Sequence, residues 1–323
     1  MSLLVCVLKD WGYPNIVQQT PSFSSTWNGV QFVFEPVPEC DVLIASNPPV
    51  SDIRIRCPQG NKWLFTGESP IEQYRWQTES FPFFDKVFTF WDSSVSQNIV
   101  HEQTSLPWHV ERSYDQLTGL TAEAACLSKR AEVSWVTSNA SHKEGHVLRM
   151  AFKDFLKANG FKFDLYGRGF EPIKDKFDGI YPYQYSLAIE NYACNDYWTE
   201  KIADCFLSWT VPIYWGAKNI SQYFPKNSFI QIDPSNPELA LKIIRTAIDE
   251  DFFSQNISAL AEARYLVLNK YQFFPHVCEL MERYGVVEGN RKVKNFIPSN
   301  TWHTGPVTPY SSFKKNIKRI LLR

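Results

Sequence analysis

Several features that would define a class of function are missing from this chain of 323 residues. No apolar run approaches the ~20 residues that a membrane-spanning helix requires. The segment 1–14 holds a short apolar run with neither a basic region nor a small-residue cleavage site, which predicts a buried strand rather than a signal peptide. The formal net charge is −1, so no overall field would attract nucleic acid. We therefore expect a globular, cytoplasmic protein that binds no nucleic acid.

Signs of a disulfide framework or a metal site are also missing. The seven cysteines are scattered singly, without a CxxC pair, as is usual in a reducing compartment. The one D-x-D match, Asp249 to Asp251, ends a helical pattern without a preceding strand, which indicates a solvated acidic turn. His142 and His146 are spaced to share a metal on a helix, but no third ligand has a matching spacing. We expect no bound metal.

What the chain does have is the composition of an ordinary packed protein of one or two domains. Hydrophobic residues make up 44% and charged residues 21% of the sequence. The aromatic share is 15%, which fits either rings that stack on sugars or an aromatic core, and composition alone favours the core. In the first part, short apolar runs beside turn residues are typical of strands buried in a parallel sheet. These predicted strands are Leu3–Leu8, Val42–Ala45, Trp63–Thr66, Lys86–Trp91 and Val133–Thr137. Predicted helices between them are Pro70–Thr78 and Leu117–Lys129.

Regular alternation of helices and strands begins near residue 140. The predicted helices are His142–Asn159, Thr199–Trp209, Pro237–Ile248 and Ile257–Phe274. The predicted strands are Phe161–Tyr166, Tyr185–Ile189, Val211–Trp215 and Phe229–Ile232. This order predicts a doubly wound α/β domain. We expect two domains, 1–140 and 141–300, with a substrate cleft between the carboxyl ends of their sheets, followed by a tail at 301–323.

The densest group of polar residues lies in the second predicted domain. Glu190 and Asn191 directly follow a predicted strand, at the end where α/β active sites lie. Thr199 is a candidate N-cap, and Glu200 and Lys201 open the next helix. The free N–H groups at such a helix start, together with the lysine charge, would hold a phosphate, and a neighbouring carboxylate would accept bonds from ribose hydroxyls. An ordinary capped helix is the alternative, and the joint pattern makes it the poorer interpretation.

The segment 183–216 resembles the signature of the α1,3/4-fucosyltransferase family. It contains Y-Q-Y-S-L-A-I-E-N, then D-Y-W-T-E-K, then V-P-I-Y-W-G, where the family has Y-K-F-x-L-x-F-E-N-S, D-Y-V-T-E-K and V-P-I-Y-W-G. The resemblance extends to Ser134–Asn139, which is similar to the family's V-S-N motif, and to Leu165–Gly169 and Ser228–Ile232. Gln184 replaces the signature lysine and Tyr192 replaces a serine. These departures leave the nucleotide-binding inference intact and concern the donor sugar.

The resemblance implies a GT-B fold, in which two Rossmann-like domains face a central cleft, with GDP-fucose bound by the second domain. By its place after the V-S-N-like motif, Arg149 would clamp the pyrophosphate together with Lys201, and Glu200 would contact the ribose. The remaining implied donor-site residues are Tyr166, Gly167, Glu190, Asn191, Tyr197 and Thr199. Cationic side chains can stabilise a GDP leaving group without a metal. From periodicity alone, Arg149 would instead be a solvated charge on a helix.

The first predicted domain should supply the catalytic base. Glu68 follows a predicted strand and a glycine turn, and its segment is similar to the family's G-E-N, whose glutamate is the proposed base. In an inverting transfer, a carboxylate deprotonates the acceptor hydroxyl on the face opposite the leaving group. A solvated loop glutamate is the alternative. Glu35, Glu72 and Glu111 are weaker candidates for the base.

The resemblance implies transfer of L-fucose from GDP-fucose to a glycan or glycoconjugate hydroxyl, expected to be the 3-hydroxyl of GlcNAc or glucose. The alternatives are the same fold with another nucleotide sugar, or a non-catalytic relative that binds glycans or nucleotides. The basic amphipathic stretch 313–323 would either contact an anionic membrane surface peripherally or pack its apolar residues on the protein body. The sequence favours neither.

Overall fold

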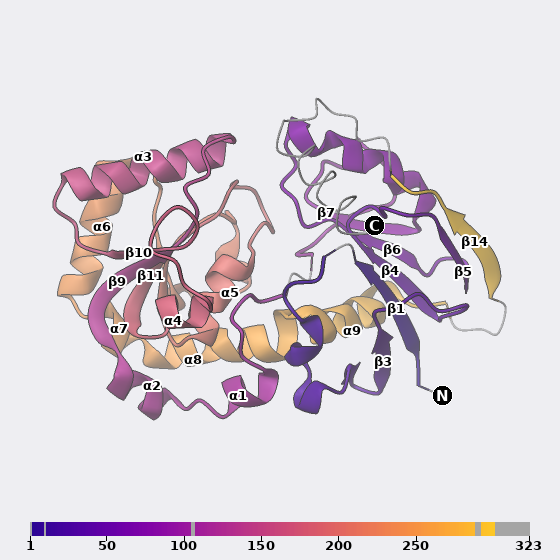
Figure 1. Cartoon of the computed structure of the whole chain (residues 1–323), viewed down its shortest axis with the longest axis horizontal. Helices are drawn as coiled ribbons and strands as arrows, with labels where there is room; N and C mark the ends of the chain where they lie inside the picture. The colour runs from indigo at the N-terminus through magenta and orange to yellow at the C-terminus, as the bar shows by residue number, and fades with distance from the viewer. Residues whose placement is uncertain (1, 10, 105–106, 288–291, 301–323) are drawn as a thin grey trace, which may run out of the picture.

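The computed structural model describes residues 2–9, 11–104, 107–287 and 292–300, and the predicted tail at 301–323 lies outside them. Two α/β halves lie side by side, each built around its own parallel sheet (Figure 1). A helical run, α8 and α9, extends beneath both halves in this view. None of the helices in the described residues is long and apolar enough to cross a membrane.

The sheet of the first half has, within the described residues, the strand order β2-β3-β1-β4-β6-β7-β8. Its strands are β1 (Leu4–Lys9), β2 (Thr26–Trp27), β3 (Val30–Val33), β4 (Val42–Ser46), β6 (Lys62–Phe65), β7 (Lys86–Thr89) and β8 (Ile99–His101). Neighbouring strands pair in parallel apart from β2 and β3. Side chains alternate between two buried clusters, with Ile44 in one and Leu43 and Ala45 in the other. Both faces of the sheet are therefore covered, which is why its strands appear as short, continuous apolar runs.

The sheet of the second half has the order β10-β9-β11-β12-β13, and its strands pair in parallel. The strands are β9 (Arg130–Val136), β10 (Asp164–Tyr166), β11 (Tyr183–Ile189), β12 (Val211–Trp215) and β13 (Ile230–Gln231). The helices of this half are α3 (Glu144–Ala158), α4 (Lys176–Ile180), α5 (Glu200–Leu207), α6 (Pro237–Asp249), α7 (Phe252–Gln255) and α8 (Ile257–Leu266). Short 3₁₀ turns occur in both halves. They are η1 (Ile16–Gln19) and η2 (Pro21–Phe23) in the first half, and η4 (Ile220–Gln222) and η5 (Lys226–Ser228) in the second. The predicted alternation in this half is confirmed.

Three helices predicted from the sequence differ in detail from those of the structure. Leu117–Lys129 is two helices, α1 (Tyr114–Thr118) and α2 (Ala122–Ser128), because Ser113 and Thr121 each cap a new helix start. Pro70–Thr78 is wrong as an α-helix, since the chain there forms a 3₁₀ helix, η3 (Glu72–Phe83). Ile257–Phe274 ends earlier, as α8, and a π-helical turn, η6 (Val267–Tyr271), joins it to α9 (Phe273–Tyr284).

The predicted boundary at 140 and 141 does not follow the two sheets. Strand β9 lies before that boundary but pairs in the second sheet. Helix α9 lies after it, yet Phe273, Phe274 and Val277 pack with the first sheet. Strand β14 (Val293–Ile297) also returns to the first half and pairs antiparallel with β5 (Ile53–Cys57). We propose domains that follow the sheets, with the described residues up to 104 and from 273 onward in the first domain.

Candidate active site

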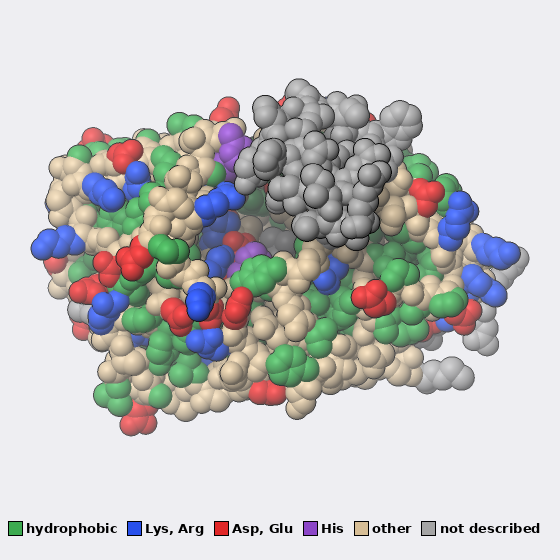
Figure 2. Space-filling model, in the orientation of Figure 1, with side chains coloured by type: hydrophobic (Ala, Val, Ile, Leu, Met, Phe, Trp, Pro, Cys, Tyr) green, Lys and Arg blue, Asp and Glu red, His purple; other side chains and the backbone are tan. Residues whose placement is uncertain are grey.

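A cavity of about 320 Å³ lies where the two halves meet. Its walls come from loops at the carboxyl ends of both parallel sheets. Lining residues of the first half include Trp11, Asn47, Gly67 and Glu68, and those of the second include His109, Asn191, Tyr197, Thr199, Glu200 and Lys201. Basic, acidic and histidine side chains gather in the hollow between the halves (Figure 2). The structure thus brings the candidate base and much of the candidate donor site to one cavity.

Glu190 anchors the start of α5 rather than lining the cavity. Because β11 ends at Ile189, Glu190 begins the loop at the carboxyl end of the strand, where it is fully buried. Its carboxylate accepts hydrogen bonds from the Thr199 N–H at 2.8 Å and from the Thr199 hydroxyl at 2.8 Å, and Lys201 Nζ lies 3.1 Å away. Burial raises the pKa of Glu190, and the charge of Lys201 opposes that rise. The carboxylate therefore fixes both α5 residues in place.

Lys201 carries its charge at the start of α5. Thr199 caps this helix as expected, its side chain accepting a hydrogen bond from the Lys201 N–H at 3.3 Å. Although burial lowers the pKa of Lys201, the charges of Glu190 and Glu200 outweigh it and raise that pKa. The side chain is still 20% exposed. A protonated ammonium at a helix start thus reaches the cavity, and the helix dipole there also favours an anion, an arrangement suited to a phosphate.

Glu200 lies among cations. Its Oε1 is 3.3 Å from Lys176 Nζ, 3.4 Å from Lys201 Nζ and 3.9 Å from His109 Nδ1. Burial alone would raise the pKa of Glu200, but the charges of Lys201 and Lys176 together hold it well below its usual range. Burial lowers the pKa of His109 to about 4, so this imidazole is neutral at pH 7. Glu200 is therefore an ionised acceptor suited to hydroxyl donors such as those of a ribose.

Arg149 lies on α3, next to the cavity wall. Its side chain is buried, and its Nη1 donates to Asn191 Oδ1 at 2.8 Å, while its Nε has no hydrogen-bond partner among the described residues. Gly145 brings α3 this close, because a Cβ there would lie 1.9 Å from the Asn191 carbonyl oxygen. Asn191 itself lines the cavity. Arg149 thus holds Asn191 in the loop after β11 and is not itself among the residues that line the cavity.

Tyr166 and Gly167 are not among the residues that line the cavity. The Tyr166 hydroxyl lies 2.6 Å from that of Tyr183. Gly167 has a φ of +113°, and a Cβ there would lie 2.0 Å from the Thr137 carbonyl oxygen. The glycine is therefore required by close backbone packing at the edge of the second sheet. Tyr197, by contrast, is buried in the cavity wall, with its ring 5.0 Å from that of Phe90 across the halves.

Four residues around the site were not predicted. His109 and Asn47 line the cavity, Lys176 pairs with Glu200, and Tyr74 adjoins Glu68. Asn47 holds the Glu68 loop, since its Oδ1 accepts from the Gly67 N–H at 3.1 Å and its φ is +69°. The sequence offered one usable signal, an asparagine at the end of a predicted strand. Of the weaker candidates for the base, Glu72 and Glu111 are exposed and line neither this cavity nor the adjoining groove.

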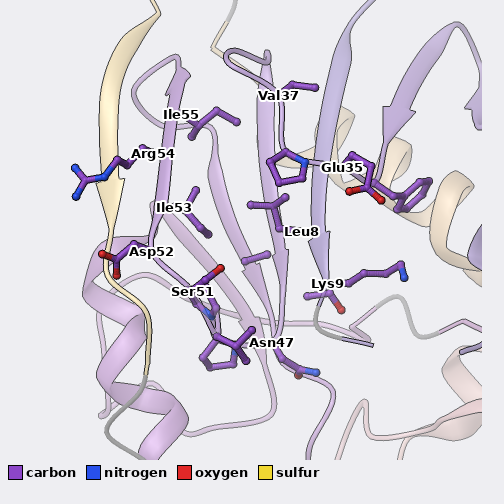
Figure 3. Close-up of a pocket in the computed structure, with 17 residues that line it drawn as sticks. Leu8, Lys9, Glu35, Val37, Asn47, Ser51, Asp52, Ile53, Arg54 and Ile55 are labelled. Carbon is purple, nitrogen blue, oxygen red and sulfur yellow. The ribbon is translucent and has the colours of Figure 1, made fainter. Parts of the chain in front are cut away.

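A larger groove of about 470 Å³ adjoins the cavity on the first half. Ser46 and Asn47 line both spaces. Figure 3 shows the apolar residues Leu8, Ile53 and Ile55 along the groove, with Lys9 and Glu35 on one side and Ser51 between the strands. Glu35 therefore belongs to the groove and not to the cavity of Glu68. Among the described residues, no group of three or more His, Cys, Asp or Glu side chains is arranged to hold a metal ion.

The second half matches a known family. The profile of glycosyltransferase family 10 (fucosyltransferase) C-term matches residues 126–295. The α-(1,3)-fucosyltransferase FucT of Helicobacter pylori is 35% identical over 74 residues, which are 23% of this chain and 16% of that protein. The human 4-galactosyl-N-acetylglucosaminide 3-α-L-fucosyltransferase 9 is 30% identical over 129 residues, 38% of this chain and 35% of that protein. The chain thus matches about a third or less of the length of these relatives.

The fold extends further than the sequence similarity. A crystal structure of an α1,3-fucosyltransferase with GDP-fucose has a TM-score of 0.53 at 20% identity and covers 90% of this chain and 91% of that one. An α-glucosyltransferase in complex with UDP-glucose and DNA has a TM-score of 0.54 at 10% identity, covering 88% and 99%. The predicted GT-B fold is confirmed. Because the family profile matches more than half of this chain, the chain belongs to glycosyltransferase family 10, the fucosyltransferases.

Proposed function

We propose that the protein is an inverting, metal-independent fucosyltransferase that moves L-fucose from GDP-fucose to a glycan hydroxyl. One observation carries the proposal: Glu68 of the first half and Lys201 of the second line the same cavity. A transferase of this kind needs a base on the acceptor side and a cation on the leaving-group side, with space for both substrates between them. Family membership and the resemblance of the 183–216 segment support the choice of donor.

The second half would bind the donor. Lys201 and the N–H groups at the start of α5 would hold the pyrophosphate, with Arg149 as the second cation. Glu200 would accept hydrogen bonds from the ribose hydroxyls, and Asn191 and Tyr197 would border the sugar. The similar crystal structure of an α1,3-fucosyltransferase with GDP-fucose supports this choice of ligand. Glu190 would act indirectly, by fixing Thr199 and Lys201.

The chemistry follows from the two sides of the cavity. Glu68 takes the proton of the acceptor hydroxyl as its oxygen attacks the anomeric carbon of fucose. The bond from that carbon to the β-phosphate oxygen breaks on the opposite face, so the configuration inverts. GDP leaves with the electron pair, and Lys201 and Arg149 offset its added negative charge. This scheme requires no metal.

A saccharide is the acceptor that the first half fits best. The adjoining groove is of the size of ligand pockets and mixes apolar walls with carboxylate, hydroxyl and amide groups. Its lining offers Lys9 and Arg54 against Glu35 and Asp52, so it has no net charge that would select an anion. The name of the human relative specifies a 4-galactosyl-N-acetylglucosaminide. We propose that the hydroxyl is the 3-hydroxyl of GlcNAc or glucose, with the rest of the acceptor in the groove.

A donor panel tests the proposal. Product formation with a lactose or N-acetyllactosamine acceptor would be measured for GDP-fucose, GDP-mannose and UDP-sugars, and the product linkage determined by NMR. We expect transfer from GDP-fucose alone, and loss of turnover in Glu68→Gln with GDP affinity unchanged by calorimetry. Transfer from another donor would reassign the substrate. GDP binding without turnover with any donor would indicate a non-catalytic relative, and near-normal turnover of Glu68→Gln would remove Glu68 from the mechanism.

A further inference from the structure

A chain of contacts leads from Glu68 across the cleft to the start of α3. Lys143, the residue directly before α3, donates a hydrogen bond from Nζ to the Tyr74 hydroxyl, and Nζ lies 4.3 Å from the centroid of the tyrosine ring. The Tyr74 hydroxyl in turn lies beside the Glu68 carboxylate. Tyr74 comes from η3 of the first half, whereas Lys143 belongs to the second. Neither residue belongs to the family motifs identified in the sequence.

The chemistry of the three groups fixes the direction of these bonds. An ammonium only donates, an ionised carboxylate only accepts, and a phenol hydroxyl does both. The single hydroxyl proton of Tyr74 must therefore point to Glu68, while its lone pair accepts from Lys143. Burial, followed by the charge and hydrogen bond of Glu68, raises the pKa of Tyr74, so the phenol keeps its proton. The charge of Lys143 faces the Glu68 carboxylate through this hydroxyl.

We propose that Tyr74 is the positioning residue of the base and that Lys143 ties it to the donor-binding half; this rests on the proposed role of Glu68. The Tyr74 hydroxyl holds one carboxylate oxygen of Glu68 and leaves the other to face the acceptor hydroxyl. Fixing the base in this way removes rotamers in which neither oxygen points into the cavity. Tyr74 and Lys143 do not touch substrate in this scheme.

The same contact connects the base to the start of α3. Lys143 directly precedes α3, and Arg149 lies on that helix a turn and a half further along. Gly145, between them, packs against Asn191 in the cavity wall. The start of α3 therefore meets the donor site through Arg149 and Asn191 and the base through Tyr74.

Steady-state kinetics of conservative variants tests this role. For Tyr74→Phe we expect kcat with GDP-fucose and acceptor to fall on the order of tenfold or more, because a loosened base spends less time aligned. GDP affinity, measured by calorimetry, and the KM for donor stay at the wild-type value. Lys143→Met gives a loss in the same direction, and Lys143→Arg, which keeps a donor to the hydroxyl, retains most of kcat. Matched controls are Tyr265→Phe, at an exposed position of α8, and Lys157→Met, at the far end of α3. Both are expected to be neutral.

The outcomes separate this role from a merely structural one. A tie that only joins the halves would lower the melting temperature of Tyr74→Phe and Lys143→Met and leave kcat of the folded protein unchanged, which would overturn the proposal. Equal losses in Lys143→Arg and Lys143→Met would also overturn it, since the conservative side chain can still donate. If Tyr74→Phe does not fold, the two Lys143 variants decide. If wild-type protein transfers no fucose, the proposed function fails instead, a result distinct from active protein with normal Tyr74→Phe turnover.

Discussion

At the scale of single residues, the buried pair of Glu190 and Lys201 combines a structural role with a functional one. Glu190 is fully buried, and its partners are Thr199 and Lys201 at the start of α5. Removing one member of a buried ion pair leaves the other charge without compensation, which costs more than the pair contributes. A simple alanine scan would therefore confuse loss of binding with loss of folding.

A pair of variants separates these roles. Lys201→Met should lower the free energy of unfolding by about 2 kcal/mol, because the Glu190 carboxylate stays buried without its cation. It should also weaken GDP binding at least tenfold, about 1.4 kcal/mol, through loss of a charge-assisted contact. Adding Glu190→Gln should recover most of the stability and none of the affinity. Urea denaturation and calorimetry measure the two quantities. Recovery of GDP affinity in the double variant would contradict a direct phosphate contact for Lys201.

At the scale of elements, α3 depends on one glycine. A methyl group at Gly145 would lie 1.9 Å from the Asn191 carbonyl oxygen, a backbone atom that cannot rotate away. Helix and loop would have to separate, and Arg149 Nη1 would lose its 2.8 Å bond to Asn191 Oδ1. The position of the cation is thus determined by the absence of a side chain one turn earlier.

We expect Gly145→Ala to be damaging although alanine is the better helix former. The overlap should cost about 1–3 kcal/mol of stability, as overpacking in cores does, and weaken GDP binding several-fold by displacing Arg149. Chemical denaturation and calorimetry are the measurements. Gly12→Ala is the matched control, because a methyl group there meets nothing within 4 Å. Unchanged GDP affinity in folded Gly145→Ala would show that α3 can move without disturbing the donor site.

Elements with long apolar runs were predictable, and those without them were not. Strands β4 and β12 appear as continuous apolar stretches because they are buried on both faces. Strand β5 alternates isoleucine and arginine and pairs with the distant β14, so no local pattern identifies that partner. Helix α9 was missed because Pro275 usually signals a helix end. In the structure this proline lies in the first turn of α9, where its missing N–H costs nothing.

The residues of the candidate site likewise divide into those that the sequence identified and those that it did not. Glu190, Asn191, Thr199, Glu200 and Lys201 lie in one stretch of sequence, so a motif identifies them and the helix start explains them. Predicting Arg149 required the family resemblance, because helix periodicity alone would leave it on the surface. His109, Tyr74 and Lys143 come from three segments that only the packing of the two halves brings together. Sequence patterns describe neighbours along the chain, and the residues that were missed are neighbours across it.

At the scale of the whole molecule, buried polar contacts fix α9 to the first half, beside the segment where the chain leaves β8 for the second half. His276 on this helix is 1% exposed, and its Nε2 lies 3.0 Å from the Gln103 carbonyl oxygen, just after β8. Arg283 forms an ion pair with Glu102 in the same segment. Burial lowers the pKa of His276 to about 4. The neutral imidazole therefore holds α9 against the segment that follows β8.

This buried histidine predicts a loss of stability in acid. Between pH 6.5 and about 4 the unfolded chain binds a proton at His276 and the folded protein does not, so stability falls as pH decreases through that window. For His276→Gln, which can still donate to Gln103, this contribution disappears. We expect the wild type to lose about 2 kcal/mol more than the variant between pH 7 and pH 5, measured by urea denaturation. Parallel pH dependence of the two proteins would refute a neutral, buried His276.

The two passages of the chain between the halves have a mechanical consequence. One follows β8, the other runs through η6 into α9, and the contacts of α9 with Glu102 and Gln103 bind them side by side. In Figure 1 the helical run of α8 and α9 lies along the bottom, and α3 lies at the top. Two connections held side by side along one edge favour a rotation of the halves about that edge. Because Lys143 and Tyr74 join the halves across the cleft, we expect their hydrogen bond to limit that rotation.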